Sequence, residues 1–480
     1  MKDSSKLEPL CVLIYPKTAE VEFSHPDVPY SILFVGSYLK ANGIRVKLFD
    51  QRISSNREIF QFIESNPVTH VGLSTMTGPQ IIFAMDISKK IKQFNPGIII
   101  VWGGIHVSVA PASVLKQGFI DFIVCGEGEE SLLELIKNPD KRPIKGVLRR
   151  DDKLEDLVPR EFMDMDTVSL EWTLIDPRTY ISQRDGRRYI SFVTSRGCSF
   201  KCQYCYNSVT NSRWRSWSVD KVRQELDKIL KFDISYIAFM DDNLGVNVKW
   251  LSQICEILER NNIHWYGDLR ANVVTPPNME KFKNCTMVFI GAESGSQEVL
   301  DDIEKRIKVE DIFNAARVLH ERGMKGTFSW IIGFPQETKD DVMATVNAVR
   351  KVSEIMPAAV QRLKIFSPYP GSRLYQETVE KGYNPPATLE NWGKYTREHC
   401  DLPYIKNPWW YKCISYVTFF NFYSQTEIIG SIGSSKPVFR PVIAVYKFLS
   451  TFRWKRKFFN FPVEFMILDY LRKVYMKVMN

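Results

Sequence analysis

Three cysteines, Cys198, Cys202 and Cys205, lie close together near the middle of the chain with the spacing C-x3-C-x2-C. Gly197 directly precedes them and allows the chain to turn sharply. Thiolates at this spacing can each bind one iron of an iron–sulfur cube. No fourth cysteine follows nearby, so one iron would stay open to a non-protein ligand. The motif favours chemistry at a [4Fe–4S] cluster over simple electron transfer, and the alternative is a zinc site, which usually takes four ligands.

The aromatic residue directly before the third cysteine, Tyr204, makes this motif resemble the C-x3-C-x-(aromatic)-C signature of radical SAM enzymes. The resemblance implies that the amino and carboxylate groups of S-adenosylmethionine (SAM) bind the open iron. It also implies that an electron from the reduced cluster cleaves the sulfonium to a 5′-deoxyadenosyl radical.

Strand-like and helix-like segments alternate from the cysteine region onward. The strands are expected at 189–194, 235–240, 264–269, 286–291, 326–332 and 360–366. The helices are expected at 218–231, 248–260, 276–283, 308–322 and 338–352. Six such units fit a partial (β/α)6 barrel, in which the chemistry gathers at the C-terminal ends of the strands.

The segments that follow these strands resemble the SAM-binding segments of the same family. By that resemblance Glu293 and Ser294 would lie near the ribose and methionyl groups, and Arg270 near the SAM carboxylate. A zwitterionic ligand such as SAM needs a carboxylate for its ammonium or hydroxyl groups and a cation for its carboxylate. The alternative is that acids at strand ends cap the following helices. The full set expected at SAM is Tyr204, Asp242 (beside Asp241), Arg270, Glu293, Ser294, Gly333 and Pro335.

The N-terminal part also alternates, which predicts a doubly wound parallel sheet with its ligand at the carboxyl ends of the strands. The strands are expected at 10–15, 44–49, 68–74, 97–102 and 120–125. The helices are expected at 30–42, 57–64, 80–94, 108–116 and from about 129.

The loops at these strand ends resemble those of the cobalamin-binding domain that precedes many radical SAM domains. The residues expected at cobalamin are Ser74, Thr75, Thr77, Gly103, Gly104, His106, Gly126, Glu127 and Gly128. Many such domains carry D-x-H-x-x-G, whose His binds cobalt, but here Asp50 is followed by Gln51 and Arg52. His106 is then either a substitute ligand or a hydrogen-bonding loop residue. The alternative for the whole domain is a sheet that binds no cofactor.

The predicted domains are residues 1–136 (cobalamin-binding), 137–188 (connector), 189–372 (radical SAM core) and 373–480 (C-terminal region). Within the connector, residues 145–156 suggest a short hairpin. The fold class is therefore α/β, with a parallel-sheet domain, a partial barrel and a mostly helical C-terminal region.

The C-terminal region differs in composition from the rest. Residues 406–480 contain twelve Lys or Arg and three Asp or Glu, whereas the net charge of the whole chain is +9. Aromatic and basic residues alternate there, as in residues 452–459. This pattern fits a helical cap on the barrel, a peripheral membrane contact or, with no motif in support, nucleic-acid binding.

The N-terminus has no apolar signal core, no 18-residue apolar run is present and the nine cysteines are mostly scattered. We therefore expect a cytoplasmic protein, with peripheral contact at the inner membrane face as a further expectation. By resemblance, its cofactors are a [4Fe–4S] cluster, SAM and cobalamin. Hydrogen abstraction from an unactivated carbon and methyl transfer from methylcobalamin are expected.

The alternatives are a cyclase or oxidase without methyl transfer, a tRNA methylthiotransferase-like enzyme or a non-catalytic corrinoid module. The expected partners are a small-molecule or lipid substrate and an electron donor such as flavodoxin or ferredoxin.

Overall fold

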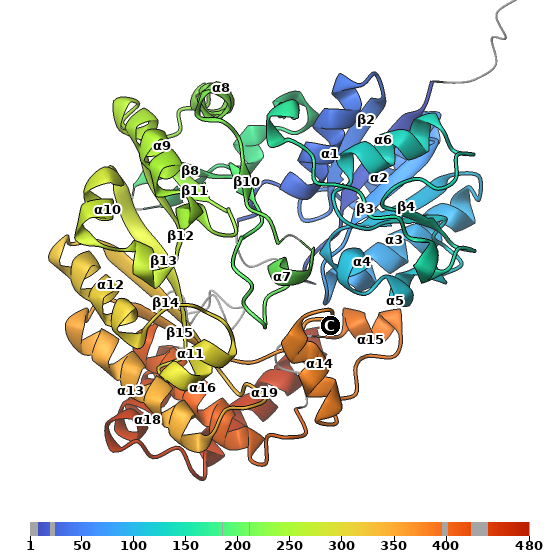
Figure 1. Ribbon diagram of the computed structural model, residues 1–480. Coiled ribbons are helices and arrows are strands. Elements are labelled where there is room, and N and C mark those ends of the chain that lie inside the picture. The colour runs from blue at the N-terminus through green and yellow to red at the C-terminus, as the bar shows by residue number, and fades with distance from the viewer. Residues whose placement is uncertain are drawn as a thin grey trace, which may run out of the picture.

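The computed structural model describes residues 8–19, 25–184, 186–210, 212–395, 402–423 and 440–479. Two sheets form its framework (Figure 1). A six-stranded sheet lies in the N-terminal part, and a curled seven-stranded sheet forms an open half-barrel in the middle of the chain. The predicted α/β fold class is confirmed.

The N-terminal sheet has the order β2-β1-β3-β4-β5-β6, and every pairing is parallel except that of β5 with β6. Its strands are β1 (Leu10–Tyr15), β2 (Arg45–Asp50), β3 (His70–Ser74), β4 (Ile99–Gly103), β5 (Phe122–Val124) and β6 (Val147–Arg149). Its helices are α1 (Tyr30–Ala41), α2 (Asn56–Ser65), α3 (Gln80–Phe94), α4 (Ile105–Val109), α5 (Pro111–Leu115) and α6 (Glu129–Lys137).

Two local predictions in this part were wrong. The single helix expected at 108–116 is two short helices, because Ala110 before Pro111 leaves the helical conformation (φ −139°, ψ 50°) and Pro111 begins α5. The hairpin expected at 145–156 does not form. Val147–Arg149 instead pairs antiparallel with β5, and Leu154–Asp156 is a 3-10 turn.

The half-barrel has the order β15-β14-β13-β12-β11-β8-β7, in which six successive strands are parallel and β7 is an antiparallel edge. Its strands are β7 (Ser182–Arg184), β8 (Arg187–Phe192), β11 (Tyr236–Phe239), β12 (His264–Leu269), β13 (Cys285–Glu293), β14 (Lys325–Ile332) and β15 (Val360–Ile365). Its helices are α8 (Val219–Leu230), α9 (Val248–Arg260), α10 (Pro276–Lys281), α11 (Gln297–Asp302), α12 (Val309–Glu321) and α13 (Lys339–Ile355). Between β8 and α8 lie β9 (Ser195–Arg196), α7 (Asn207–Thr210) and β10 (Arg215–Ser216).

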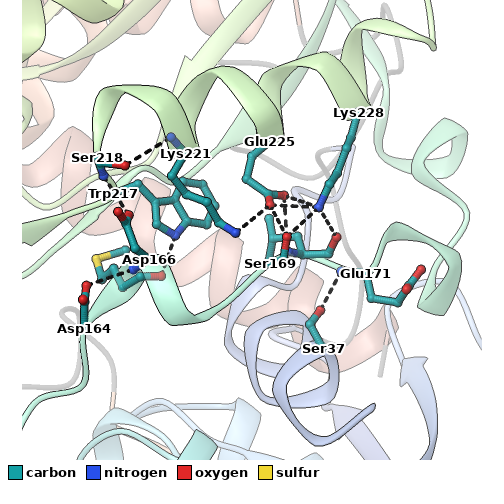
Figure 2. A network of polar contacts seen from close by, with 12 residues as sticks. Ser37, Asp164, Asp166, Ser169, Glu171, Trp217, Ser218, Lys221, Glu225 and Lys228 are labelled. Atoms are coloured by element: carbon teal, nitrogen blue, oxygen red, sulfur yellow. Dashed lines mark hydrogen bonds and ion pairs between the residues drawn. The ribbon is translucent and has the colours of Figure 1, made fainter. Parts of the chain in front are cut away.

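The connector is fixed to α8 by one buried carboxylate (Figure 2). Glu225 of α8 is fully buried and accepts hydrogen bonds from Ser169 Oγ (2.7 Å) and from the backbone N–H of Leu170 (3.2 Å). Lys228 Nζ, 2.8 Å away, and Lys221 Nζ, 3.5 Å away, balance its charge. A buried carboxylate is tolerated only with such partners, so this segment is held in place although its sequence shows little periodicity.

The C-terminal region consists of α14 (Arg373–Glu380), α15 (Leu389–Gly393), α16 (Pro408–Phe422), α18 (Arg440–Arg456) and α19 (Val463–Met479). Helix α16 packs on β15, and α18 and α19 pack on α16, as a helical cap would. Helix α15 instead packs against α3 of the N-terminal part (Figure 1). None of the described helices is long and apolar enough to cross a membrane.

Candidate functional site

The three cysteines lie on the loop between β9 and α7, and the side chain of Cys202 is buried. Asp242, at the end of β11, fixes this loop by accepting hydrogen bonds from the backbone N–H of Gly197 and from the Tyr206 hydroxyl, both at 2.9 Å. Asp242 thus holds the loop at both of its ends, before the first cysteine and after the third.

Asp241 is directed the other way, into the protein. It accepts hydrogen bonds from the backbone N–H of Thr194 (3.1 Å), from the Thr194 hydroxyl (2.9 Å) and from the Ser195 hydroxyl. Burial outweighs these hydrogen bonds and raises its pKa to about 7. Asp241 and Asp242 therefore both hold the cysteine loop, Asp241 through the residues just before it.

The residues around the cysteines fit an iron–sulfur cluster. Burial raises the pKa of the Cys205 thiol to about 12, so a thiolate there needs positive charge close by, which iron would supply. Arg270 adds a cation, with Nη1 3.9 Å from Cys202 Sγ. Among the described residues no three Cys, His, Asp or Glu side chains are gathered to hold a single metal ion.

Arg270 lies at the end of β12 and is fixed on two sides. Its guanidinium is 3.7 Å from the centre of the Phe200 ring, and its Nη2 donates to the carbonyl oxygens of Lys305 and Arg306. Its Nε is buried and makes no hydrogen bond within the described chain, as expected for a donor reserved for a ligand.

Glu293 ends β13 in a left-handed conformation (φ +63°) at a bulge in the pairing with β14. Such a conformation is costly for a non-glycine residue and is held only when its surroundings fix it. Lys305 does so, because its Nζ lies 2.7 Å from Glu293 Oε1 and 3.3 Å from the Tyr204 hydroxyl. Lys305 could not be singled out from its sequence context, because the charged residues around it are typical of an exposed turn.

Ser294, Gly333 and Pro335, also expected at SAM, make their contacts with segments that follow them in the chain. The Ser294 hydroxyl faces Thr345 of α13 at 3.1 Å, so its side chain points out of the barrel. Gly333 has φ +88°, its N–H donates to Glu337, and its carbonyl oxygen accepts from the Tyr404 hydroxyl at 3.0 Å. Pro335 follows in the same turn, where its carbonyl oxygen accepts from Lys381.

A cavity of about 320 Å³ opens beside these groups. It is lined by Tyr204, Cys205, Tyr206, Glu293, Ser329, Ile331, Lys364, Ile365, Phe366, Ser367 and Tyr369. It therefore joins the cysteine loop to Glu293 and to the ends of β14 and β15, within the size range of small-ligand sites. A second cavity of about 240 Å³, between Arg142 and Asp156 in the connector, lies elsewhere and includes none of the expected site residues.

Asp268 of β12 is a further acidic group inside the half-barrel that the sequence did not single out for a role. Its side chain is open to solvent on one side. The protein around the carboxyl, together with the negative charges of Asp242 and Asp241, raises its pKa to about 7. A carboxyl of this kind is partly protonated at neutral pH and can donate a hydrogen bond.

The glycine loops expected at cobalamin meet at the carboxyl edge of the N-terminal sheet. The backbone N–H and hydroxyl of Thr75 donate to the Gly103 carbonyl oxygen at 2.9 and 3.1 Å. Gly104 (φ +99°) is packed so tightly that a Cβ there would lie 2.6 Å from the backbone N and O of Thr75. Glycine is therefore needed at position 104 for the two loops to pack against each other.

His106 is buried in this cluster, and both ring nitrogens have partners. Nδ1 lies 3.0 Å from the Thr77 hydroxyl and Nε2 lies 3.1 Å from the Ser113 hydroxyl, while the ring contacts Trp392 of α15. Burial lowers its pKa to about 4. These contacts support the hydrogen-bonding alternative over cobalt ligation.

The position of the missing motif after β2 is occupied by an ion pair. Arg52 binds both oxygens of Asp50, with its Nη2 at 2.7 Å, and the Tyr180 hydroxyl donates to the same carboxylate at 3.2 Å.

The third loop joins the two halves of the molecule. Glu127 accepts from Arg196 Nη1 (3.1 Å) and from Arg215 Nη2 (2.8 Å), and Glu129 accepts from Arg196 Nη2 (2.6 Å). Although burial would raise the pKa of Glu127, the two arginines hold it below its ordinary value. Gly126 (φ +87°) and Gly128 flank this carboxylate, and Gly126 has open space at its Cβ position.

Two further contacts place the sheet edge beside the cysteine loop. Helix α4, which begins after Gly104, lies against α7, which begins after Cys205. The Tyr30 hydroxyl donates to the backbone oxygen of Ser191 in β8 at 2.7 Å, and the backbone N–H of Val28 donates to the Ser191 hydroxyl at 3.0 Å. The two expected cofactor regions therefore adjoin.

Comparisons with known proteins agree with this arrangement. Residues 18–136 match the B12 binding domain, and residues 192–349 match the radical SAM superfamily. An uncharacterized methyltransferase of Pyrococcus horikoshii is 30% identical over 336 residues, which are 67% of this chain and 71% of that protein.

Two further similarities are to proteins of different activity, one by sequence and one by fold. The anaerobic magnesium-protoporphyrin IX monomethyl ester cyclase of Rubrivivax gelatinosus is 25% identical over 76% of this chain and 68% of its own. The solved structure of the radical SAM methyltransferase TsrM from Kitasatospora setae, with cobalamin and a [4Fe–4S] cluster, superposes with a TM-score of 0.65 at 16% identity. That match covers 82% of this chain and 83% of TsrM.

Proposed function

The chain belongs to the radical SAM enzymes that carry a B12-binding domain, and from this premise we propose that it transfers a methyl group to an unactivated carbon of its substrate. Its cofactors are a [4Fe–4S] cluster, SAM and cobalamin. When bound, these supply a reducing electron, a hydrogen-abstracting adenosyl radical and a transferable methyl group. The protein's part is to position and shield them.

The observation that carries the proposal is the contact between α4 and α7. It brings the loops expected to hold cobalamin next to the loop expected to hold the cluster. A methyl transfer of this kind needs a substrate carbon that is reached from both cofactors, and adjoining sites allow that. The likeness to the uncharacterized methyltransferase of P. horikoshii supports the same reaction class.

The proposed roles follow from the contacts. Cys198, Cys202 and Cys205 hold the cluster, and Asp242 holds their loop. Arg270, with its unpartnered buried Nε, receives the SAM carboxylate. Glu293, kept in place by Lys305, receives the ammonium or ribose hydroxyls.

At the cobalamin site the protein acts mainly through its backbone. Gly103, Gly104 and the turn containing Ser74, Thr75 and Thr77 form a surface without bulky side chains. His106 fixes this turn through Thr77, and Glu127 fixes the third loop against the barrel.

We further propose a small-molecule or lipid substrate in the half-barrel, with Asp268 as a hydrogen-bonding group for it. The raised pKa favours the protonated carboxyl of Asp268, which can donate a hydrogen bond to an oxygen or nitrogen of the substrate. A flavodoxin or ferredoxin is the proposed electron donor.

The first test is anaerobic reconstitution with iron, sulfide and hydroxocobalamin, followed by metal analysis and an optical spectrum. About four irons and about one cobalt per chain are expected from the family's cofactors. The reconstituted enzyme is then incubated with SAM deuterated at its methyl group, a reductant and a metabolite and lipid extract. A methylase incorporates the label into a product and forms both S-adenosylhomocysteine and 5′-deoxyadenosine.

The second candidate is a cyclase or oxidase with the same cofactors, which the likeness to the R. gelatinosus cyclase supports. That enzyme class would form 5′-deoxyadenosine without S-adenosylhomocysteine, and the label of each cleaved SAM would leave on the released methionine and not on a product. This result would replace methyl transfer while keeping the radical step.

A further inference from the structure

Large apolar side chains are exposed mainly at one place, the C-terminal helix pair. Of 18 large hydrophobic side chains exposed among the described residues, 11 lie between Val442 and Leu471. The most exposed are Phe461 (81%), Phe448 (73%) and Tyr470 (67%). Concentrations of this kind mark a contact with another apolar phase.

The exposed residues follow helical spacing, so each helix presents an apolar stripe outward. On α18 the stripe includes Val445, Phe448 and Phe452, and on α19 it includes Val463, Ile467 and Tyr470. Residues three and four positions apart share one face of a helix. Phe461 extends the apolar surface into the turn between the two helices. We call these seven residues the apolar face.

The opposite sides of the same helices already form the packed interior. Phe465 of α19 is fully buried and stacks on Tyr416 of α16 with 5.3 Å between ring centres. Arg453 of α18 binds Glu464 of α19, and the Tyr446 hydroxyl donates to the Glu464 backbone oxygen at 2.9 Å. The inner sides of α18 and α19 thus hold the two helices in place, and the apolar face does not take part in this packing.

The positive charge of this region indicates that the partner of the apolar face is anionic. Residues 440–480 contain nine Lys or Arg and two Asp or Glu. Both acids are used inside the fold, Glu464 by Arg453 and Asp469 by the Tyr416 hydroxyl. Lys455 and Arg456, by contrast, are exposed at the end of α18 beside the apolar face, and the Arg456 guanidinium lies 5.3 Å from the Phe452 ring centre.

We propose that the apolar face and its flanking cations dock the enzyme on an anionic membrane surface. Exposed aromatic residues enter the headgroup layer, and Lys and Arg beside them meet anionic phosphates, which is the pattern of interfacial helices. Because α16 joins this helix pair to β15, docking would hold the half-barrel close to the bilayer. The proposal does not depend on methyl transfer.

The test is vesicle flotation of the reconstituted full-length enzyme. The vesicles are pure phosphatidylcholine or phosphatidylcholine with about one-third phosphatidylglycerol, a composition that supplies the anionic surface. We expect clear flotation with the anionic vesicles, weaker flotation with neutral ones, and release as salt is raised. The triple variant Phe448→Ser, Phe461→Ser, Ile467→Ser should partition at least about tenfold more weakly, because apolar burial supplies much of interfacial binding.

A control variant removes three exposed apolar groups from the N-terminal part and connector, namely Ile53→Ser, Phe94→Ser, Leu154→Ser. This variant should float like the wild type, and circular dichroism should show that both variants are folded. A wild-type protein that stays unbound on anionic vesicles overturns the proposal, as does a triple variant that binds unchanged. A dimer that the triple variant abolishes, without vesicle binding, would assign the face to contact between copies of the chain.

Discussion

Lys305 Nζ and Glu293 Oε1 lie 2.7 Å apart inside the half-barrel, and both side chains are only 8% exposed. Breaking a buried ion pair by removing one partner costs about 3–5 kcal/mol, because the other charge is left uncompensated. The pair also ties the left-handed backbone at the end of β13 to the Tyr204 side of the cysteine loop. SAM binding and local stability should therefore both depend on Lys305.

Lys305→Met should lower the free energy of unfolding by about 3–5 kcal/mol and weaken SAM binding, as measured by denaturant titration and equilibrium dialysis. The double variant Lys305→Met, Glu293→Gln should recover much of the stability but not the SAM binding. Arg306→Met, one residue on and with an exposed side chain, is the control and should change neither. Recovery of SAM binding in the double variant would remove Glu293 from the SAM site.

Cys202→Ala should abolish both the visible absorbance of the reconstituted cluster and the formation of 5′-deoxyadenosine from SAM, because the cube loses one of its three thiolates. Cys255→Ala, at a buried cysteine of α9 away from the motif, should retain both signals. Retained SAM cleavage in the Cys202 variant would refute the cluster assignment.

Gly104→Ala should reduce cobalamin retention by at least about tenfold, because the new Cβ would collide with the Thr75 backbone and the positive φ disfavours alanine. The measurement is cobalt per folded chain after gel filtration. Gly118→Ala, where nothing lies within 4 Å of the Cβ position, should retain cobalamin like the wild type. Equal retention in the two variants would mean that this loop does not shape the cobalamin site.

The stability of the N-terminal part should fall as the pH is lowered. Burial lowers the pKa of His70 to about 4, below its ordinary value near 6.5. The neutral form is thus favoured in the folded state. Its contribution is fully present above about pH 6.5 and is lost towards about pH 4, up to about 3 kcal/mol in total.

His70→Gln removes this titration. Urea titrations at several pH values should therefore show that the stability difference between wild type and variant shrinks between about pH 6.5 and about pH 4.5. A constant difference would mean that His70 is protonated equally in both states.

Much of the framework could be predicted because its elements carry strong periodic patterns. Helices α3 and α9 and strand β12 have the predicted bounds, and the six parallel barrel strands lie where alternation placed them. The pairing of β6 with β5 could not be predicted, because the partner of Val147–Arg149 is about 25 residues away and no turn chemistry marks it.

The site was predictable where a residue's type determines its chemistry, as for the three cysteines. The site was less predictable where a side chain can either bind a ligand or make a structural contact within the protein. Asp242 holds the cysteine loop and Ser294 faces α13, while Lys305, which looked like part of a charged turn, is buried. Such choices depend on tertiary contacts that local sequence does not encode.

Val28 and Tyr30, which donate hydrogen bonds to Ser191, also contribute to one continuous hydrophobic core. This core includes Leu13 in β1, Trp217 and Phe465 in α19. The boundaries that divide the chain by cofactor therefore do not divide it by folding. Cutting after residue 136 would expose apolar surface on both fragments. Because both halves unfold together, binding of a cofactor at one site should also raise the unfolding temperature of the half that holds the other site.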